Sequence, residues 1–462
     1  MDSGMAEMNM ARDLGLILPE IIVVLTAVAA LVAGMFRRHE LALACTLVGL
    51  LIATFLTAPL LGENTTVFMG TFQIDDLSVW AKLILLPATG LVAVLAAPEV
   101  RGTDREATVY SLLSFATIGA LALAGAGDLM FLVLGLLLSS LASFALVAYP
   151  RTDRATEAAM KYFVFGAVSG SVMIFGLTYW FGATGSTLIA TLDRLQGQPV
   201  ATIAGLSAVL VGLGFKSATA PFHFWAPDAY DGAPIAVAAY LSIVPKIGAL
   251  FALAQVVQSL PAGDANWPFV LAVLATLSMT YGNLAALPQT NVVRLLAYSS
   301  IAQAGYFLLG IVAIARSDLA VQALVVFSAA YAAMNLGAFA IVVRIGRDLS
   351  EFVGVGRSAP WAGAAMVVFL LSLVGVPPFA GFAGKLLLFG AAIDAGYTWL
   401  AVVAILNSVL SLAVYLRIIV PMYQSPQAVP AAGRPVAIVW MTALLLTVGI
   451  GLAAQVIVGR VA

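Results

Sequence analysis

Three lysines interrupt long apolar stretches of this sequence. Lys216 ends the run LSAVLVGLGFK, Lys246 lies inside YLSIVPKIGALF, and Lys385 follows a proline pair in VGVPPFAGFAGKLLLF. A charge at the centre of a bilayer-spanning helix costs about 2.5–3.5 kcal/mol, so such residues normally face the protein interior or water and mark an ion pathway. Burial favours the neutral form of a lysine, which makes a buried lysine a usable proton carrier near neutral pH. The three lysines are therefore candidates for a proton path.

A simpler interpretation exists for each lysine taken alone. Its long stem could carry the ammonium group to the membrane interface, or the charge could neutralise a nearby carboxylate. Three lysines in three separate apolar segments, two of them beside prolines, favour the functional interpretation.

The stretch GFKSATAPFHFWAPDAYDGAP contains one of the two histidines of the chain, His223. An unperturbed histidine titrates near neutrality, so His223 could pass protons between Lys216 and Lys246. It could equally be a buried histidine satisfied by backbone or hydroxyl partners. Asp228 and Asp231 in the same stretch are predicted to cap the following helix or to hydrate its mouth.

Prolines occur within seven residues of two of the lysines, Pro221 after Lys216 and Pro377–Pro378 before Lys385. Proline removes a backbone hydrogen bond and breaks a helix, and unpaired backbone at membrane depth is tolerated only beside protein or water. We therefore predict two broken helices, five spans apart. Broken helices at corresponding positions of two halves indicate an internal repeat with a polar site near the membrane midplane.

The elements that must position these residues are membrane helices. The sequence is 62% hydrophobic and 9% charged, which a soluble domain of 462 residues would not tolerate on its surface. Apolar runs of about 20 residues, enough to cross a bilayer as a helix, recur from end to end. The sequence thus predicts an all-α polytopic membrane protein, a single domain over 1–462, with fourteen transmembrane helices of which the seventh and twelfth are broken. The predicted spans are approximately 13–36, 40–61, 77–98, 107–126, 128–149, 157–182, 200–219, 234–260, 267–287, 292–314, 318–345, 362–393, 397–422 and 434–458.

Arginines fall mainly in alternate loops, and cytoplasmic loops carry the excess of positive residues. The pattern predicts that both termini lie on the periplasmic side. Loops predicted to be inside hold Arg37, Arg38, Arg101, Arg105, Arg151, Arg154, Arg294, Arg344, Arg347, Arg357 and Arg434; segments predicted to be outside hold Arg12, Arg194, Arg316 and Arg460.

Several classes of site are not expected. The net charge of −1 argues against a nucleic-acid-binding surface, and a single cysteine, Cys45, argues against a disulfide framework or a cysteine-ligated cluster. The two histidines have no spacing typical of a zinc or haem site, and no glycine-rich phosphate loop follows a strand. No metal and no cofactor is expected in this chain.

The motifs GFKSATAPFHFWAPDAYDGAP, TEAAMKYFVFGAVSG, PQTNVVRLLAYSSIAQAGY and VPPFAGFAGKLLLF together resemble the antiporter-like subunits of the proton-translocating NADH:quinone oxidoreductase (complex I), in particular subunit N. The resemblance covers nearly the whole chain. It implies two inverted five-helix repeats, about 107–260 and 267–422, and a midplane path through Lys216, Lys246 and Lys385.

The resemblance also implies a membrane-arm subunit that couples quinone reduction to proton translocation and does no redox chemistry by itself. Flavin, iron–sulfur clusters and NADH would belong to partner subunits, with quinone as the substrate of the complex. The implied partners are other membrane-arm subunits, including a sister antiporter-like subunit and the small K-type subunit, together with membrane lipids in a bacterial cell inner membrane.

The sequence departs from this family at three positions. Leu137 stands where the family has a glutamate in a Gly-Leu-Glu-Leu run, Val293 where a lysine is common, and Gln303 where a histidine is common. Ser139, Ser140 and water are candidates to replace the missing glutamate in the first half of the path. Two alternatives remain open: a cation/proton antiporter subunit, which shares the ancestral repeat, and a non-pumping structural copy.

Overall fold

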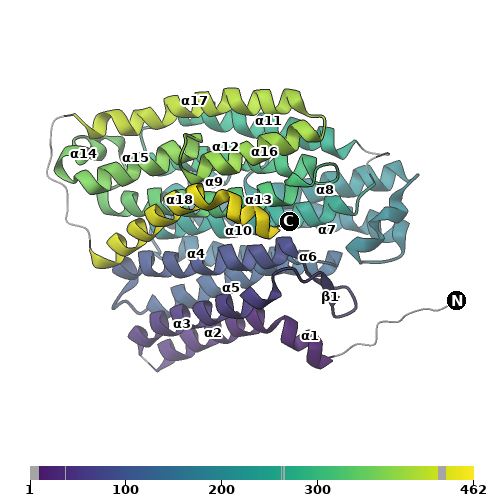
Figure 1. The fold of residues 1–462 in the computed structure, drawn as a ribbon. Coiled ribbons are helices and arrows are strands. Elements are labelled where there is room, and N and C mark those ends of the chain that lie inside the picture. The colour runs from purple at the N-terminus through teal and green to yellow at the C-terminus, as the bar shows by residue number, and fades with distance from the viewer. Residues whose placement is uncertain (1–9, 37, 262, 264–265, 425–432, 462) are drawn as a thin grey trace.

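A computed structural model describes residues 10–36, 38–261, 263, 266–424 and 433–461. In this part of the chain most residues are helical, and the long helices lie side by side in one bundle (Figure 1). The N-terminal helices α2 and α3 form one edge of the bundle in this view, and α17 forms the opposite edge. The helices are α1 Met10–Leu16, α2 Leu18–Met35, α3 His39–Thr57, α4 Asp76–Val100, α5 Glu106–Ala124, α6 Leu129–Ala148, α7 Asp153–Thr184, α8 Pro199–Ser217, α9 Ala226–Gly232, α10 Ile235–Gln258, α11 Trp267–Ala286, α12 Val292–Ala313, α13 Leu319–Ile345, α14 Val355–Ser358, α15 Pro360–Val374, α16 Ala380–Asp394, α17 Thr398–Met422 and α18 Arg434–Val461.

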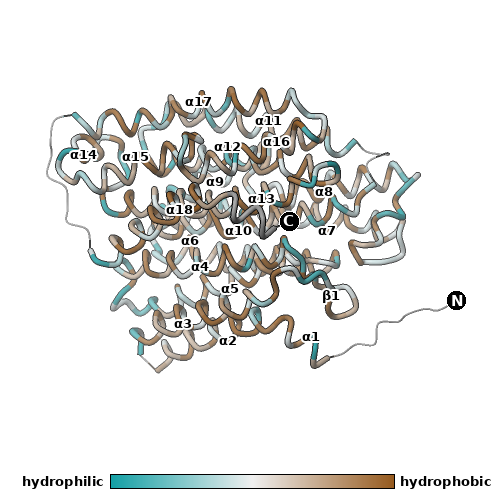
Figure 2. The backbone as a smooth tube through the Cα atoms, in the orientation of Figure 1, coloured by the Kyte–Doolittle hydropathy of each residue, from teal (hydrophilic) through white to brown (hydrophobic). Residues whose placement is uncertain are grey.

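The number of membrane crossings agrees with the sequence prediction. In the described residues, thirteen helices are long and apolar enough to cross a bilayer. The remaining predicted span, the twelfth, is divided into the shorter helices α15 and α16. Hydrophobic residues dominate nearly every one of these helices, and hydrophilic residues gather at their ends (Figure 2).

Three helices, α10, α12 and α13, form the centre of the bundle. In each of them 94% of the most apolar window is buried inside the chain itself. Close approach of the backbones needs small residues, and a Cβ added to Gly248 of α10 would lie 2.6 Å from the carbonyl oxygen of Ala120 in α5. The central helices carry Lys246 and its partners, so that lysine is held far from lipid.

Both predicted helix breaks are present. Helix α8 ends at Ser217 and α15 at Val374, and each is followed by a residue with left-handed backbone, Ala218 with φ 56° and Gly375 with φ 97°. The two breaks differ in the length of the next helix. After α8 the chain forms only the seven-residue helix α9 before α10 starts, whereas α15 is followed by the fifteen-residue helix α16.

Neighbouring hydroxyl groups satisfy backbone N–H groups that the breaks release. The N–H of Ala220 donates to Ser278 Oγ of α11 at 2.9 Å, and the N–H of Gly381 donates to Ser372 Oγ of α15 at 3.0 Å. Such partners are required because an unpaired backbone group away from water costs about as much as a lost hydrogen bond. The polar residues next to the breaks thus stabilise irregular backbone inside the bundle.

Some elements were not expected from the sequence. A two-stranded antiparallel hairpin, β1 Thr65–Val67 and β2 Phe72–Ile74, connects α3 to α4. The predicted first span is divided into α1 and α2, and Pro19 lies in the first turn of α2, where its missing N–H has no cost. Of the arginines used for the topology, Arg37 and the side chain of Arg460 lie outside the described residues.

The two predicted five-helix repeats correspond to helices α5–α10 and α11–α17. Their inverted relation stays a prediction.

Candidate functional site

Lys216 is fully buried between α6, α7 and α8. Only 1% of the residue is exposed. Its Nζ donates to Ser140 Oγ of α6 at 3.1 Å and to Tyr162 Oη of α7 at 3.3 Å. A hydroxyl group can accept from an ammonium group or donate to a neutral amine, so this pocket can accommodate both forms of the lysine.

Lys246 lies one position after Pro245 in the central helix α10 and is completely buried. Its Nζ donates to the backbone oxygen of Ser300 in α12 at 2.5 Å and also to Ser300 Oγ. The Ser300 hydroxyl pairs with Tyr331 Oη at 2.9 Å, and Tyr331 donates to the carbonyl oxygen of Ser242 at 3.1 Å. A chain of hydroxyl groups therefore extends from Lys246 into α13.

Lys385 lies in α16, seven residues after the second proline of its break, and is 2% exposed. Its Nζ donates to the backbone oxygen of Val374 at 3.0 Å and to Ser408 Oγ at 3.2 Å. The same atom lies 3.8 Å from the ring centroid of Tyr306, whose hydroxyl pairs with Ser408 at 2.9 Å. The aromatic face adds a favourable cation–π contact in a buried site.

Lys216 and Lys385 share one feature that the sequence spacing does not show directly. Lys216 belongs to the last turn of α8, and Lys385 donates to the last carbonyl group of α15. The C-terminal end of a helix carries roughly half a negative elementary charge, and broken membrane helices use such ends to hold cations. No carboxylate pairs with either lysine, or with Lys246, within the described ranges. Backbone carbonyl and hydroxyl groups thus take the place of a counter-ion.

Polar side chains continue between Lys246 and Lys385. Ser299, next to Ser300, pairs with Tyr415 Oη at 2.6 Å, and Gln303 Nε2 lies 3.4 Å from that same oxygen. Gln303 also donates to the carbonyl oxygen of Leu373 at 3.2 Å. This carbonyl group adjoins Val374, the residue that binds Lys385. Gln303 therefore connects the hydroxyl groups beside Lys246 to the end of α15, where Lys385 binds.

His223 is buried but does not contact the lysines. It is 4% exposed, and its ring packs against Phe224 and Tyr281 with centroid distances of 4.6 and 4.5 Å. Nδ1 has no hydrogen-bond partner, and no bond joins His223 to Lys216 or Lys246 in the part of the chain that is described. A relay through His223 would need intervening water and stays a prediction.

A hydroxyl group of α6, one helical turn from Leu137, contacts Lys216. Leu137 is 42% exposed on the outer side of α6, whereas Ser140 reaches Lys216. Ser139 is fully buried and its Oγ has no partner. Of the two serines named from the sequence as candidate replacements, Ser140 makes the contact.

A fourth buried lysine was missed from the sequence. Lys82 of α4 is completely buried and forms an ion pair with Glu20 of α2, with Nζ and Oε1 2.7 Å apart. The sequence did contain a signal for this pair, since Glu20 lies in the apolar span 13–36 and Lys82 in the apolar span 77–98. Because Lys82 has a carboxylate partner outside the two predicted repeats, its arrangement differs from that of the other three lysines.

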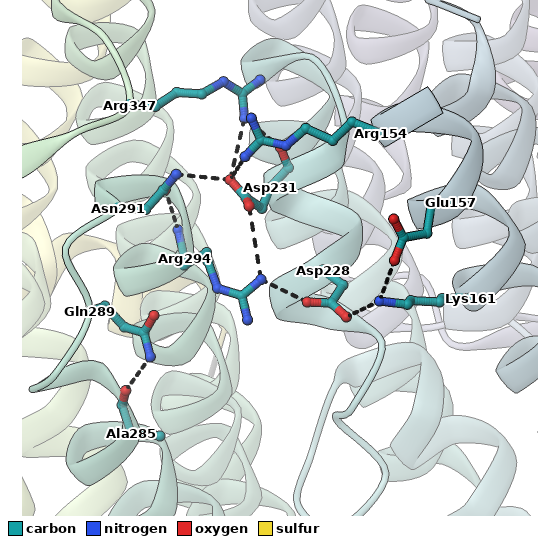
Figure 3. A network of polar contacts seen from close by, with 10 residues as sticks. All are labelled: Arg154, Glu157, Lys161, Asp228, Asp231, Ala285, Gln289, Asn291, Arg294 and Arg347. Atoms are coloured by element: carbon teal, nitrogen blue, oxygen red, sulfur yellow. Dashed lines mark hydrogen bonds and ion pairs between the residues drawn. The ribbon is translucent and has the colours of Figure 1, made fainter. Parts of the chain in front are cut away.

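Charged side chains gather where α7 and α12 begin, beside the short helix α9 (Figure 3). Asp228 of α9 accepts hydrogen bonds from Lys161 Nζ of α7 at 2.9 Å and from Arg294 Nη1 of α12 at 2.7 Å. Glu157 forms a second ion pair with Lys161, also at 2.9 Å. Burial raises the pKa of Asp228, but the hydrogen bonds from Lys161 and Arg294 outweigh burial, and the net pKa lies below its ordinary value.

Asp231 extends this network, as Figure 3 shows. It pairs with Arg154 Nη2 at 2.5 Å and accepts a hydrogen bond from Asn291 at 2.9 Å, while Arg347 donates to its backbone oxygen at 2.7 Å. Neither aspartate caps α10, which starts after Pro234 without a side-chain cap. The predicted capping role was wrong, because basic groups of α7 and α12 engage both carboxylates.

The network is connected to the Lys216 pocket through one aromatic pair. Trp225, directly before α9, stacks on Tyr162 with ring centroids 4.1 Å apart and an interplanar angle of 12°. The Trp225 indole also donates to the carbonyl oxygen of Phe215 at 2.8 Å. Trp225 therefore connects α9 to the tyrosine whose hydroxyl group contacts Lys216.

Comparison with known proteins places this arrangement in a family. Residues 126–411 match the family described as NADH:quinone oxidoreductase/Mrp antiporter, TM. The chain is 40% identical to NADH-quinone oxidoreductase subunit N 1 of Streptomyces griseus subsp. griseus over 95% of both chains. It is 38% identical to F(420)H(2) dehydrogenase subunit N of Methanosarcina mazei over 88% of both. A chain of respiratory complex I from Thermus thermophilus superimposes with a TM-score of 0.85 at 33% identity, over 96% of this chain and 99% of that one. The chain therefore belongs to the NADH:quinone oxidoreductase/Mrp antiporter transmembrane family, among the subunit N proteins.

Proposed function

We propose that the chain is a membrane-arm subunit of a respiratory NADH:quinone oxidoreductase and couples quinone reduction in other subunits to proton translocation. Lys216, Lys246 and Lys385 carry the proton along the interior of the bundle, and His223 serves the first half of the path through water. The proposal rests on the family and on three buried lysines that have hydroxyl and carbonyl partners in place of carboxylates.

The partners of each lysine suit a proton carrier. An ammonium group only donates hydrogen bonds, whereas a neutral amine can accept one. Ser140, Ser300 and Ser408 each bring a hydroxyl group to one lysine, and a hydroxyl can turn to donate or to accept. A fixed carboxylate would instead favour the charged form alone. Each lysine can thus gain or lose its proton without leaving an unpaired polar group.

The redox chemistry of the complex would take place in other chains. Flavin, iron–sulfur clusters and the NADH site would lie in partner subunits, and quinone would be reduced outside this chain. The neighbours would be membrane-arm subunits, among them a sister antiporter-like subunit and the K-type subunit. The chain would lie in a bacterial inner membrane, and the arginine distribution supports an orientation with both termini periplasmic.

Lys385→Ala tests the path directly. In inverted membrane vesicles we expect normal assembly on a native gel and a strong reduction of protons taken up per NADH oxidised. Leu386→Ala is a matched control, since Leu386 is the next residue of α16 and is 55% exposed on its outer face. Full proton uptake by an assembled Lys385→Ala complex would refute the assignment of Lys385.

A cation/proton antiporter subunit is the second candidate, because the matching family includes Mrp antiporters. Vesicles with an imposed sodium gradient and no NADH distinguish the two functions: proton movement under these conditions supports the antiporter. A third candidate is a non-pumping copy. Lys216→Ala tests it, since an assembled complex of normal proton stoichiometry would show that the first half of the path is silent.

A further inference from the structure

We propose that hydroxyl groups on one face of α17 conduct the proton between Lys246 and Lys385, with Tyr415 as the central carrier. This role rests on the proposed function of the two lysines. Helix α17 lies at an edge of the bundle (Figure 1), and only 39% of its most apolar window is buried. Its apolar residue Val409 is 65% exposed, whereas Ser411 and Tyr415 are each 1% exposed. The two hydroxyl residues are therefore turned toward the interior of the bundle.

The hydroxyl residues of α17 form a row. Ser408, Ser411 and Tyr415 are three and four positions apart, so they lie on one face of the helix. The row covers seven residues, or about 10 Å along the helix axis. A long side chain on a helix lies over the turn that precedes its own Cα. We therefore expect the Tyr415 ring to extend toward Ser411.

At one end the row joins the Lys246 site. Tyr415 Oη pairs with Ser299 Oγ of α12 at 2.6 Å, which is near the short limit for a bond between two hydroxyl groups. Ser299 directly precedes Ser300, whose hydroxyl group contacts Lys246. Tyr415 is thus held against the part of α12 that binds Lys246.

At the other end the row reaches Lys385. Ser408 Oγ accepts a hydrogen bond from Lys385 Nζ at 3.2 Å. Ser411 lies one turn further along α17, and its Oγ donates to the carbonyl oxygen of Ser408 at 2.7 Å. A serine hydroxyl can rotate from this carbonyl oxygen toward a neighbouring hydroxyl group or a water molecule. Ser411 can therefore bridge the interval between Tyr415 and Ser408.

Gln303 also lies between the two lysine sites, but an amide is a poor proton carrier. Its Nε2 donates to the carbonyl oxygen of Leu373 at 3.2 Å and to Tyr415 Oη at 3.4 Å. The carbonyl oxygen has no proton to release, and the amide nitrogen only donates, whereas a phenol both donates and accepts. Gln303 is thus a positioning residue that holds Tyr415, and the proton passes through Tyr415.

The transfer changes the protonation state of the lysines alone. In one passage Lys246 changes from ammonium to amine, and Lys385 changes from amine to ammonium. Each hydroxyl oxygen between them accepts one proton and releases the proton that it held. No bond to carbon forms or breaks, and the hydroxyl groups rotate back before the next passage.

Tyr415→Phe tests the route in the assembled complex, because it removes the phenol oxygen and keeps the ring. The measurement is the initial rate of proton uptake by inverted vesicles supplied with NADH. A positioned proton-transfer group contributes about 100-fold or more in rate, and we expect a decrease of about tenfold because water can partly replace the phenol. Tyr110→Phe is the matched control, since Tyr110 is fully buried and its hydroxyl group has no hydrogen-bond partner among the described residues. The parental rate in an assembled Tyr415→Phe complex would refute the route.

A solvent isotope effect separates proton transfer from a purely structural role of Tyr415. We expect the ratio of the uptake rates in ordinary and heavy water to rise in Tyr415→Phe, because proton transfer across the interval becomes the slow step. A lower melting temperature with an unchanged isotope ratio would show that Tyr415 only holds α17 against α12, and the route would be wrong.

Ser411→Ala tests the middle of the row with little effect on folding, since alanine favours a helix more than serine does. Ser114→Ala in α5 is its control, because Ser114 is also buried and donates to a carbonyl oxygen of its own helix, that of Tyr110, at 3.0 Å. We expect slower proton uptake in Ser411→Ala than in Ser114→Ala. Equal rates in the two variants would contradict a route through Ser411.

Lys385→Ala in the same vesicles distinguishes the route from the proposed function on which it rests. A loss of pumping in both Lys385→Ala and Tyr415→Phe supports the route. A loss in Lys385→Ala with normal pumping in Tyr415→Phe refutes the route through α17 and leaves the lysine path intact. Normal pumping in both variants refutes the proposed function itself.

Discussion

Gly119→Ala is the sharpest test of the hydroxyl partner of Lys216. Gly119 lies where α5 crosses α6, and a Cβ added there would meet the backbone nitrogen of Ser139 at 2.3 Å and its Cα at 2.7 Å. Ordinary contact needs at least 3.4 Å, so the two helices must separate by about 1 Å. The obstacle is backbone rather than the end of a flexible side chain, and side-chain rotation alone cannot relieve it.

The displacement reaches the next residue of α6. Ser140 Oγ lies 3.1 Å from Lys216 Nζ, and a shift of about 1 Å away from α5 lengthens or misaligns this bond beyond useful range. A misplacement of this size costs a catalytic arrangement up to roughly 100-fold in rate, while the overpacking itself costs about 1–3 kcal/mol of stability. We expect a complex that assembles but pumps slowly. The measurement is the initial rate of proton uptake by inverted vesicles supplied with NADH.

Two further variants decide what a loss of pumping means. Gly170→Ala in α7 is the matched control, because a Cβ at this buried glycine meets nothing within 4 Å. Ser140→Ala removes the hydroxyl group without moving a helix and should reproduce the slow pump. An assembled Gly119→Ala complex with the parental rate, or a normal rate in Ser140→Ala, would refute the reasoning that Lys216 depends on this hydroxyl.

Other predictions concern charged pairs. Because hydrogen bonds from Lys161 and Arg294 hold the pKa of Asp228 below its ordinary 3.8, the stability that its charge contributes is present above that value and is lost as the pH falls through the lowered pKa. The melting temperature of Asp228→Asn should therefore lie below that of the parent by a constant amount between about pH 5 and 8, corresponding to roughly 1 kcal/mol for a partly exposed pair. The difference should vanish in stronger acid. A difference that grows on acidification would contradict this prediction. Lys82→Met should destabilise the subunit by about 3–5 kcal/mol, because it leaves the Glu20 carboxylate without its partner, and the double variant with Glu20→Leu should recover most of that loss in a thermal melt of the purified complex. If the double variant melts no higher than Lys82→Met, the two charges do not act as a pair.

The sequence was sufficient to predict the fold and three of the buried lysines, since apolar length and interrupted helices follow from composition and from proline chemistry. The breaks at Pro221 and Pro377 lie where the sequence placed them. The partners of Lys216 could be predicted only in part. Ser140 was named as a candidate together with Ser139 and water, but Tyr162 comes from another helix whose rotation the sequence does not specify.

Two interpretations failed because they considered one helix at a time. Asp228 and Asp231 precede a helix and so resemble capping residues, but their partners Lys161, Arg294 and Arg154 come from helices far away in the sequence. The ion pair of Lys82 with a residue of α2 was missed for the same reason. Pairing between helices depends on how the bundle packs, and hydropathy along one chain segment contains no such information.

The position of Lys216 and Lys385 at the ends of half-helices has an evolutionary consequence. Their negative environment comes partly from main-chain carbonyl groups, which every amino acid carries and which no single codon change removes. A side-chain carboxylate, in contrast, can be lost in one substitution. A chain with Leu137 rather than a carboxylate in α6 can therefore still keep a cation-binding environment, as long as the proline and the left-handed residue that end each half-helix are retained. Selection on the helix breaks should accordingly be stronger than selection on the acidic residues around them.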